Sequence, residues 1–277
     1  MTENKLIVEV ASIPIFLALH NAPFYDDLRL LYHEFISKKP CDIKIDVYLN
    51  DKPNNKEEGL FKVSFLNNKI MLSSTDFSGF LDITEKKGQV NIFSKWPLES
   101  LGNFLRNVYS MLIIKNGGLV LHASAVVRER KAYIFFGPSG SGKSTIAELS
   151  KPYYPVLSDD LVVIKRYNGI YKGFGTPYWG DMKTNNGINC SFEIAGFFKL
   201  VKSRKVYLKR LSRLHAMTEI LSIPRISDDS QLVGQLLDMT NELVDNVPCY
   251  EMHFLPDNSF WRCIDERFCE KIPMPVS

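Results

Sequence analysis

The sequence predicts an α/β protein, α+β overall, with a β-rich N-terminal domain over residues 1–105 and a second domain over residues 106–277. Before residue 95, apolar residues alternate with polar ones, which is the period-2 pattern of half-buried strands. After residue 119, the pattern becomes strand, glycine-rich loop, helix and strand, as in α/β proteins. The length of 277 residues accommodates two domains, since one domain takes about 100–200 residues.

In the first domain, the alternation predicts short strands in a mainly antiparallel sheet. These strands are Ile43–Leu49, Phe61–Phe65, Ile70–Leu72 and Gln89–Phe93. Asn67 and Asn68 are typical of a tight turn between two of them. The polar stretch 50–59 reads as an exposed loop, and a helix is expected near residues 26–37.

A longer helix is predicted to begin at Pro97, because proline suits the first helical position. Apolar residues follow at spacings of three and four, which indicates one buried face. They are Leu98, Leu101, Phe104, Leu105, Val108 and Leu112. Asn116, Gly117 and Gly118 end the helix. We expect the boundary between the two domains around this helix.

In the second domain, two strands, Leu119–Val127 and Lys131–Phe136, are expected to lie side by side. A loop at 137–142 then leads into a helix over residues 144–150. Short strands flank Asp159 and Asp160. Near the C-terminus, residues 227–229 resemble an N-cap for a helix with Leu232, Leu236, Met239 and Leu243 at helical spacing.

The segment Gly137–Ser144 matches G-x-x-x-x-G-K-[ST] at every defined position. Glycines let successive backbone N–H groups face one anion, and the following helix adds the positive end of its dipole. Lys143 can reach the β- and γ-phosphates, and the Ser144 hydroxyl can ligate Mg²⁺. The sequence therefore predicts a site for nucleotide phosphates.

Asp159 and Asp160 follow fifteen residues after Ser144. Phosphoryl transfer needs one carboxylate for the metal and often a second to deprotonate the attacking group. Adjacent residues at a strand edge project to opposite sides, so the two acids can divide these roles. Taken alone, the pair would be an exposed turn; beside the glycine motif, we favour the functional interpretation.

Composition and charge exclude several classes of protein. A formal charge of +3 and 23% charged residues give no basic stripe of the kind that nucleic-acid binding requires. The five cysteines are scattered without a C-x-x-C pair, which favours reduced thiols over disulfides or zinc. The apolar run 13–19 is too short to span a bilayer. We expect a cytoplasmic protein that binds neither nucleic acid nor membrane.

Two further segments have open interpretations. The segment 175–181, rich in glycine and aromatic residues, is either a wall of the nucleotide or acceptor pocket or a packed turn. The basic stretch 199–213 is either a solvated face or the source of an arginine that neutralises the transferring phosphoryl group. Arg204 and Arg210 are its first candidates for that role.

The ordered segments 122–125, 135–145 and 157–160 resemble the catalytic domain of HPr kinase/phosphorylase. They are also similar to the nucleotide-binding core of ATP-dependent phosphoenolpyruvate carboxykinase. Both families carry an upstream histidine, a P-loop and a downstream Asp-Asp pair in this order. The resemblance covers residues 117–165, with a looser similarity to about residue 260. It implies a mixed-sheet P-loop kinase core, flanked by helices and different in topology from ordinary Walker-type ATPases.

The resemblance also implies roles for individual residues. Ser144 and Asp160 would hold Mg²⁺, Asp159 would act as the base toward an acceptor hydroxyl, and His122 would lie close to the transferring phosphate. The residues expected to act in catalysis are Asp159, Lys143 and His122. Lys143 would also bind ATP. The ATP-binding set is Gly137, Pro138, Ser139, Gly140, Ser141, Gly142, Lys143, Ser144 and Thr145.

The expected activity is an ATP- and Mg²⁺-dependent HPr-kinase-like serine kinase that acts on a small protein or peptide. The first hundred residues do not resemble the N-terminal domain of the bifunctional enzyme, and we expect them to bind the acceptor or regulate the enzyme. The signature linked to dephosphorylation is also not found. A kinase for a small-molecule hydroxyl, a carboxykinase and a non-catalytic nucleotide-binding regulator are the alternatives, and a homo-oligomer stays open.

Overall fold

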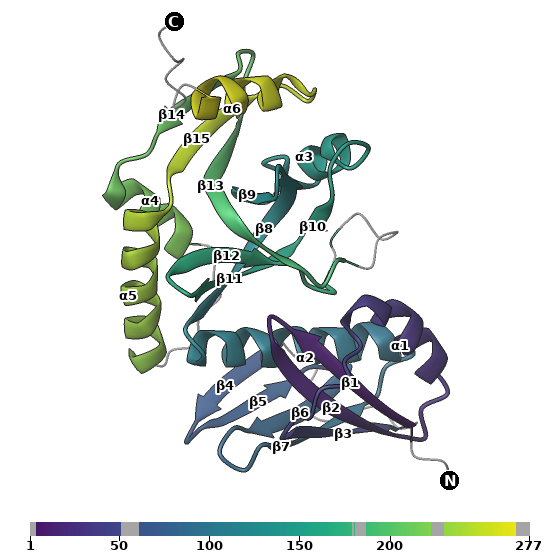
Figure 1. Cartoon of the computed structure of the whole chain (residues 1–277). Helices are drawn as coiled ribbons and strands as arrows, with labels where there is room; N and C mark the ends of the chain where they lie inside the picture. The colour runs from purple at the N-terminus through teal and green to yellow at the C-terminus, as the bar shows by residue number, and fades with distance from the viewer. Residues whose placement is uncertain (1–3, 51–60, 179, 181–186, 223–229, 270–277) are drawn as a thin grey trace, which may run out of the picture.

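The computed structural model describes residues 4–50, 61–178, 180, 187–222 and 230–269. Two mixed β-sheets and six α-helices make up this part of the chain (Figure 1). The predicted exposed loop at 50–59 and the predicted cap at 227–229 lie almost entirely outside the described residues. None of the helices in the described ranges has the length and apolarity that a membrane crossing requires.

The first sheet is formed before residue 95 and has the strand order β1-β2-β3-β7-β6-β5-β4. Its strands are β1 (Asn4–Val10), β2 (Ile13–His20), β3 (Ile43–Leu49), β4 (Lys62–Leu66), β5 (Lys69–Ser73), β6 (Phe77–Asp82) and β7 (Lys87–Ile92). The four predicted strands are confirmed as β3, β4, β5 and β7. Asn67 and Asn68 both have positive φ, at 50° and 60°, so they form the expected turn between antiparallel β4 and β5. All pairs are antiparallel except β2–β3 and β3–β7.

The predicted helix near residues 26–37 is shorter than expected. It consists of α1 (Tyr25–Leu31) and a 3₁₀ turn, η1 (His33–Phe35). Leu28 and Phe35 are buried, and η1 contacts β1. Ser37 N–H donates to Ile7 O. This turn therefore covers part of the free edge of β1.

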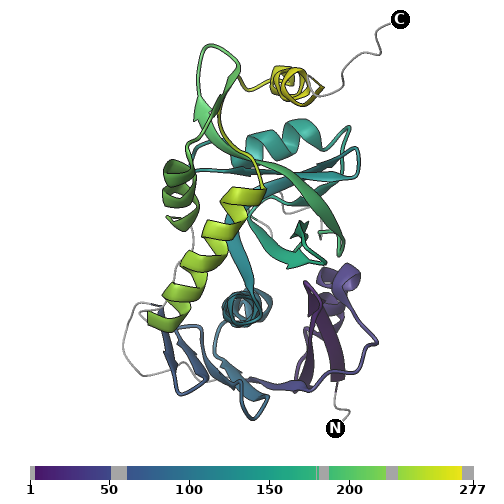
Figure 2. The same ribbon diagram turned by 60° about the vertical axis from the view of Figure 1, so that its left-hand side comes forward.

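Helix α2 (Pro97–Lys115) lies between the two sheets, and Figure 2 views it almost end-on. It contacts strands of the first sheet and also β8 of the second. Phe104 packs edge-on against Phe77 of β6, with ring centroids 6.0 Å apart. The Tyr109 hydroxyl donates to Val8 O at 2.6 Å. The helix continues through residues 105 and 106, where we predicted the domain division, and one apolar core extends over both sheets.

The second sheet has eight strands in the described residues. They are β8 (Gly118–Arg128), β9 (Lys131–Phe136), β10 (Val156–Ser158), β11 (Leu161–Tyr167), β12 (Ile170–Phe174), β13 (Ser191–Lys202), β14 (Tyr207–Arg210) and β15 (Cys249–Phe254). Five of these strands form a closed series of pairs: β8 with β9, β9 with β13, β13 with β12, β12 with β11, and β11 with β8. Five strands therefore close into a ring. The long strands β8 and β13 make this possible, because each pairs with three strands along its length: β8 with β9, β10 and β11, and β13 with β9, β12 and β15.

Helices cover the outside of this sheet. Helices α3 (Lys143–Ser150) and α6 (Ser259–Cys269) pack on an aromatic cluster that includes Phe135, Phe198 and Phe260. The Trp261 indole N–H donates to the buried Ser150 hydroxyl at 3.1 Å and so ties α6 to α3. Helices α4 (Arg213–Leu221) and α5 (Ser230–Asn246) pack against each other. The predicted helix at 232–243 is thus confirmed as α5.

Candidate functional site

The glycine loop, residues 137–142, connects β9 to α3 with the geometry that its glycines allow. Gly142, immediately before α3, has φ of +109°, and a Cβ there would lie 2.6 Å from Phe254 Cζ. Gly140 has φ of +75° with no atom near a Cβ position. Both conformations are poorly accessible to other residues. Pro138, Ser139 and Gly140 are exposed, so the outer side of the loop is open to a ligand.

Lys143 is a buried cation at the first position of α3, with 6% of its surface exposed. Its Nζ donates to Gly137 O at 3.0 Å and to Pro138 O at 3.2 Å. Burial lowers the pKa of this ammonium group below its usual value, and the charge of nearby Asp160 opposes that shift. Two neutral carbonyl groups offer incomplete compensation for a buried charge. The head of α3 therefore favours an anion.

The hydroxyls around Lys143 complete this end of the site. The Ser141 hydroxyl is buried with no hydrogen-bond partner in the described part of the chain. Ser144 and Thr145, half-buried, lie in the first turn of α3. Buried hydroxyls normally have a hydrogen-bond partner, and phosphate oxygens would supply one to Ser141. The loop that holds this hydroxyl has no space for a Cβ at Gly142, as expected of a tight phosphate-binding loop.

The acid pair, Asp159 and Asp160, lies between β10 and β11 and is almost wholly buried. The Ser158 hydroxyl fixes this bend: it accepts from Asp160 N–H at 3.3 Å and Leu161 N–H at 3.1 Å, and donates to Tyr178 O at 3.1 Å. Asp159 Oδ1 accepts from Gly180 N–H at 3.1 Å. The two carboxylates have different partners, as adjacent positions at a strand edge predict.

Asp160 contacts two basic side chains. Arg106 Nη1 lies 2.8 Å from Asp160 Oδ2, and His122 Nδ1 lies 2.7 Å from Asp160 Oδ1. Burial alone would raise the pKa of Asp160, but the hydrogen bonds and charges of His122 and Arg106 outweigh it and leave the pKa below its usual value. Asp160 is therefore an ionised carboxylate at neutral pH, which is the form that a divalent cation requires.

The structure thus brings Lys143, His122 and Asp160 together. Asp160 acts on the pKa of Lys143, so the glycine loop and the acid pair share one electrostatic environment. No group of three or more His, Cys, Asp or Glu that could hold a metal occurs among the described residues. Ser144 and Asp160 are hard oxygen donors, and such donors suit Mg²⁺ when phosphate oxygens and water supply the other ligands.

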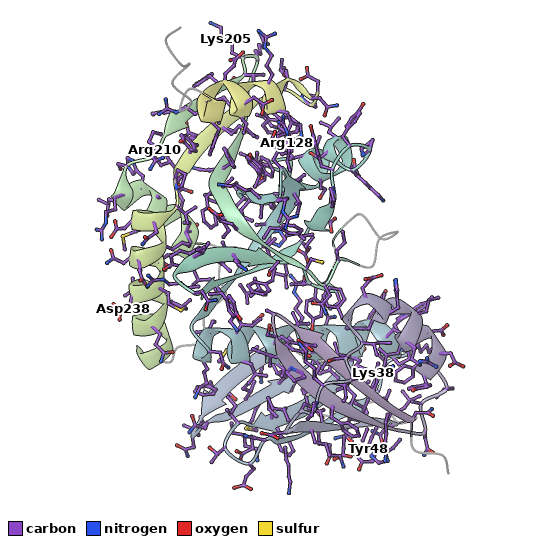
Figure 3. All side chains as sticks on the ribbon, in the orientation of Figure 1. Lys38, Tyr48, Arg128, Lys205, Arg210 and Asp238 are labelled. Atoms are coloured by element: carbon purple, nitrogen blue, oxygen red, sulfur yellow. The ribbon has the colours of Figure 1, made fainter. Side chains whose placement is uncertain are left out.

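Arg106 is the site residue that the sequence analysis missed. It lies on the predicted helix beside buried Leu105, and only the long-range contact with Asp160 distinguishes it from a surface arginine. The two arginines that we favoured lie elsewhere. Arg204 is in the exposed turn after β13, and Arg210 Nη1 donates to the Tyr250 hydroxyl at 3.2 Å. Figure 3 shows Arg210 and Lys205 near β14 and α6.

The segment 175–181 passes beside the acid pair. Thr176 Oγ1 donates to Leu161 O at 2.7 Å, and Tyr178 is buried. Gly180 is close enough to Asp159 that a Cβ would lie 3.4 Å from Oδ2. Residues 179 and 181 lie outside the described residues. The described part of this segment is packed, with Thr176 and Tyr178 buried, and it contacts Asp159 through Gly180.

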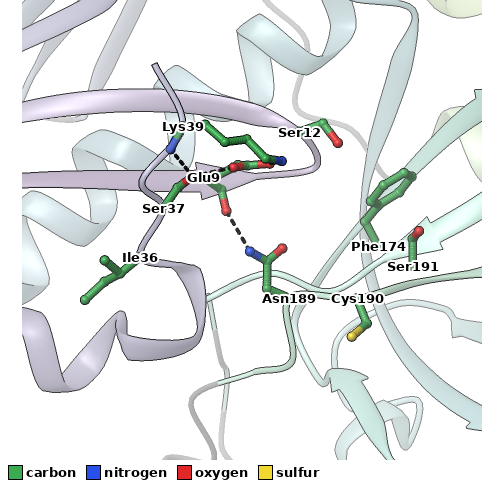
Figure 4. Close-up of a pocket in the computed structure, with 9 residues that line it drawn as sticks. All are labelled: Glu9, Ser12, Ile36, Ser37, Lys39, Phe174, Asn189, Cys190 and Ser191. Atoms are coloured by element: carbon green, nitrogen blue, oxygen red, sulfur yellow. Dashed lines mark hydrogen bonds and ion pairs between the residues drawn. The ribbon is translucent and has the colours of Figure 1, made fainter. Parts of the chain in front are cut away.

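A polar cavity of about 270 Å³ lies between the β1–β2 end and the chain leading into β13 (Figure 4). Glu9 lines it and is paired with Lys39 Nζ at 2.7 Å and with the Ser37 hydroxyl at 2.7 Å. Asn189 Nδ2 donates to Glu9 O at 3.4 Å. The charged groups that line the cavity, Glu9 and Lys39, are therefore already paired with each other, and the lining includes no residue of the glycine loop or the acid pair.

Residues 94–269 match the family model described as "SynChlorMet cassette protein ScmC". The chain belongs to the ScmC family. The match contains α2, the glycine loop, the acid pair and α6. A search of curated proteins gave no match. Among solved structures, the HPr(Ser) kinase/phosphatase from Coxiella burnetii matches this ScmC-family chain with a TM-score of 0.35 and 13% identity, over 55% of this chain and 91% of that one.

Proposed function

We propose that this protein is an ATP- and Mg²⁺-dependent kinase that transfers the γ-phosphoryl group to a hydroxyl of a small protein or peptide, with serine as the acceptor residue, in the cytoplasm. One observation carries the proposal. A buried lysine at the head of α3, incompletely neutralised, lies within electrostatic reach of Asp160, one of two adjacent buried carboxylates. The combination supplies an anion site and a metal-and-base site side by side.

Phosphate binding is assigned to the glycine loop and Lys143. The N–H groups of residues 138–143 and the dipole of α3 would face the phosphate oxygens. Lys143 Nζ would exchange its two carbonyl acceptors for phosphate oxygens, which would restore the compensation that its ammonium group lacks. The Ser141 hydroxyl would gain a partner in the same step.

The acid pair would divide the remaining work. Asp159 would accept the proton of the acceptor hydroxyl as its oxygen attacks the γ-phosphorus, and the electron pair of the broken P–O bond would leave with ADP. Asp160 and Ser144 would hold Mg²⁺, which neutralises the β- and γ-phosphate charge when bound. His122, through Asp160 Oδ1, would fix the orientation of that carboxylate.

The acceptor class rests on the resemblance to HPr kinase. A kinase for a small-molecule hydroxyl would use the same site. A nucleotide-binding regulator would use only the part that binds the nucleotide, without phosphoryl transfer. A transfer assay distinguishes the three functions. It contains the protein, radiolabelled ATP, Mg²⁺ and candidate peptides that contain serine. We expect label on the serine peptide and none on a matched peptide with alanine in its place. Transfer to small alcohols alone would favour the second function, and tight ATP binding without transfer to any acceptor would favour the regulator.

A further inference from the structure

We propose that Arg106 is the arginine that neutralises the transferring phosphoryl group, and that its ion pair with Asp160 is the resting position from which it moves to the phosphate. The inference rests on the proposed function. It also gives this role to α2, on the N-terminal side of the glycine loop, and not to Arg204 or Arg210, the first candidates from the basic stretch 199–213.

The position of Arg106 supports a movement of the side chain alone. The neighbouring α2 residues Leu105 and Val108 are fully buried, and Tyr109 is bonded to Val8, so the helix backbone is fixed. In contrast, 35% of the Arg106 side chain is exposed, against 8% for Asp160. The guanidinium group therefore lies on the open side of a buried carboxylate, where a change of rotamer can redirect it.

The charges around Asp160 give a reason for the Arg106 side chain to leave Asp160 when Mg²⁺ and nucleotide bind. Arg106 and Lys143 already place two positive charges near one carboxylate, and Mg²⁺ at Asp160 would add two more. Like charges a few ångströms apart in a partly buried site repel one another, because solvent screens them less than in bulk water. A polyphosphate beside the acid pair would offer Arg106 oxygen acceptors with the planar, bidentate geometry that guanidinium prefers.

Several other arginines of the described chain have partners outside the site. Arg128 is paired with Asp265, Arg166 with Glu242, and Arg213 with Asp245. Arg210 lies over the Tyr250 ring. Arg106, in contrast, touches a residue of the site itself.

During transfer, the acceptor oxygen forms a bond to the γ-phosphorus and its proton goes to Asp159. The bond between the γ-phosphorus and the bridging oxygen breaks, and its electron pair stays on ADP. Arg106 takes no part in the proton balance. It would donate N–H bonds to a γ-phosphoryl oxygen, where charge is spread in the transition state.

The test compares Arg106→Gln and Arg106→Lys with the control Arg210→Gln. Calorimetry with Mg²⁺ measures binding of a non-hydrolysable ATP analogue and of ADP to the full chain. We expect the preference of the wild type for the analogue over ADP to fall about tenfold in Arg106→Gln, and to be partly restored in Arg106→Lys. The control should keep the wild-type preference. The transfer rate should fall at least about a hundredfold in Arg106→Gln.

Each outcome is decisive. A wild-type preference and rate in Arg106→Gln would overturn the role of Arg106 while leaving the kinase in place. Nucleotide binding by the wild type without transfer would refute the kinase, and the analogue preference would still report on Arg106. Absence of nucleotide binding would refute both. If circular dichroism shows Arg106→Gln to be unfolded, Arg106→Lys decides: a partial loss of analogue preference and of rate in the folded variant supports the proposal, and wild-type values of both contradict it.

Discussion

At the scale of single residues, Asp160 is the carboxylate that interacts with the basic side chains of the site. It is buried, accepts from Arg106 and His122 through different oxygens, and influences the pKa of Lys143. Removal of these partners would leave an uncompensated charge at a buried position, which is destabilising, although solvent at the exposed Arg106 and His122 side chains reduces the cost. The carboxylate therefore contributes to the stability of the resting fold as well as to the proposed metal site.

The first prediction concerns acid stability. The pKa of Asp160 in the folded protein is below its usual value of 3.8, so its stabilisation is present above that value and is lost as the pH falls through the folded pKa. Asn at this position keeps the shape without the charge. We expect urea unfolding between about pH 6 and pH 2 to show a shallower loss of stability in Asp160→Asn than in the wild type. All other carboxylates are present in both proteins, so the difference between them reports on Asp160. Parallel plots of unfolding free energy against pH would contradict this account of Asp160.

Sequence reasoning selected Lys143, Ser144, Asp159 and Asp160 because these residues form short motifs. It selected His122 through the family resemblance alone. It did not reach Arg106, whose partner lies more than fifty positions away in the chain. Nothing in the local pattern of α2 marks that arginine, since Arg beside Leu105 is equally compatible with a solvated face. Contacts of this kind depend on how α2 and the second sheet pack.

At the scale of elements, the connection from β9 to α3 depends on the conformation of Gly142. Its positive φ permits the turn, and the nearby ring of Phe254 on β15 leaves no space for a side chain. The closed ring of strands holds β9 next to β13, and β13 next to β15. The shape of the glycine loop is thus set partly by the far end of the chain.

The second prediction uses two glycines of this loop. Gly142→Ala imposes both a disfavoured φ and a clash with Phe254, and we expect it to destabilise the protein by about 2–4 kcal/mol and to remove ATP binding. Gly140→Ala meets no neighbouring atom, so it should cost only about 1 kcal/mol. Chemical denaturation and calorimetry measure the two effects. Equal stability losses in the two variants would show that Phe254 does not constrain the loop.

The third prediction concerns the contact between α6 and α3. Trp261→Phe keeps an aromatic ring in the cluster but removes the donor to the buried Ser150 hydroxyl. We expect a loss of about 1–3 kcal/mol, part of it from the unsatisfied hydroxyl. The double variant Trp261→Phe with Ser150→Ala should recover some of this loss, as measured by a double-mutant cycle. Strict additivity would mean that the hydrogen bond contributes nothing.

At the scale of the whole molecule, α2 joins the two sheets. Its apolar residues belong to one core that extends from β1 to the end of α5, and Arg106 projects from it to the acid pair. The alternation of β3, β4, β5 and β7 and the three-and-four spacing of α2 were readable from sequence. Strands β1 and β2 were not predicted, because runs such as Ile13–Leu19 are too uniformly apolar to show a period. Ring closure of β8 through β13 depends on pairings between distant segments.

The fourth prediction follows from this shared core. Phe104→Ala removes a fully buried ring that packs on Phe77 of the first sheet, at an expected cost of about 3–5 kcal/mol. Hydrogen exchange should show faster amide opening in β8 of the second sheet as well as in β6. Acceleration confined to β6 and its neighbours would instead indicate that the two sheets unfold as independent domains.

The most direct test of the central claim is Mg²⁺-dependent phosphoryl transfer by the wild type, Lys143→Ala and Asp159→Asn under identical conditions. We expect transfer of label from γ-labelled ATP to a serine acceptor by the wild type alone. Lys143→Ala should also lose nucleotide affinity, whereas Asp159→Asn should bind ATP and fail in transfer, because only the base is missing. Wild-type turnover by either variant would contradict the assignment of this site as a kinase centre.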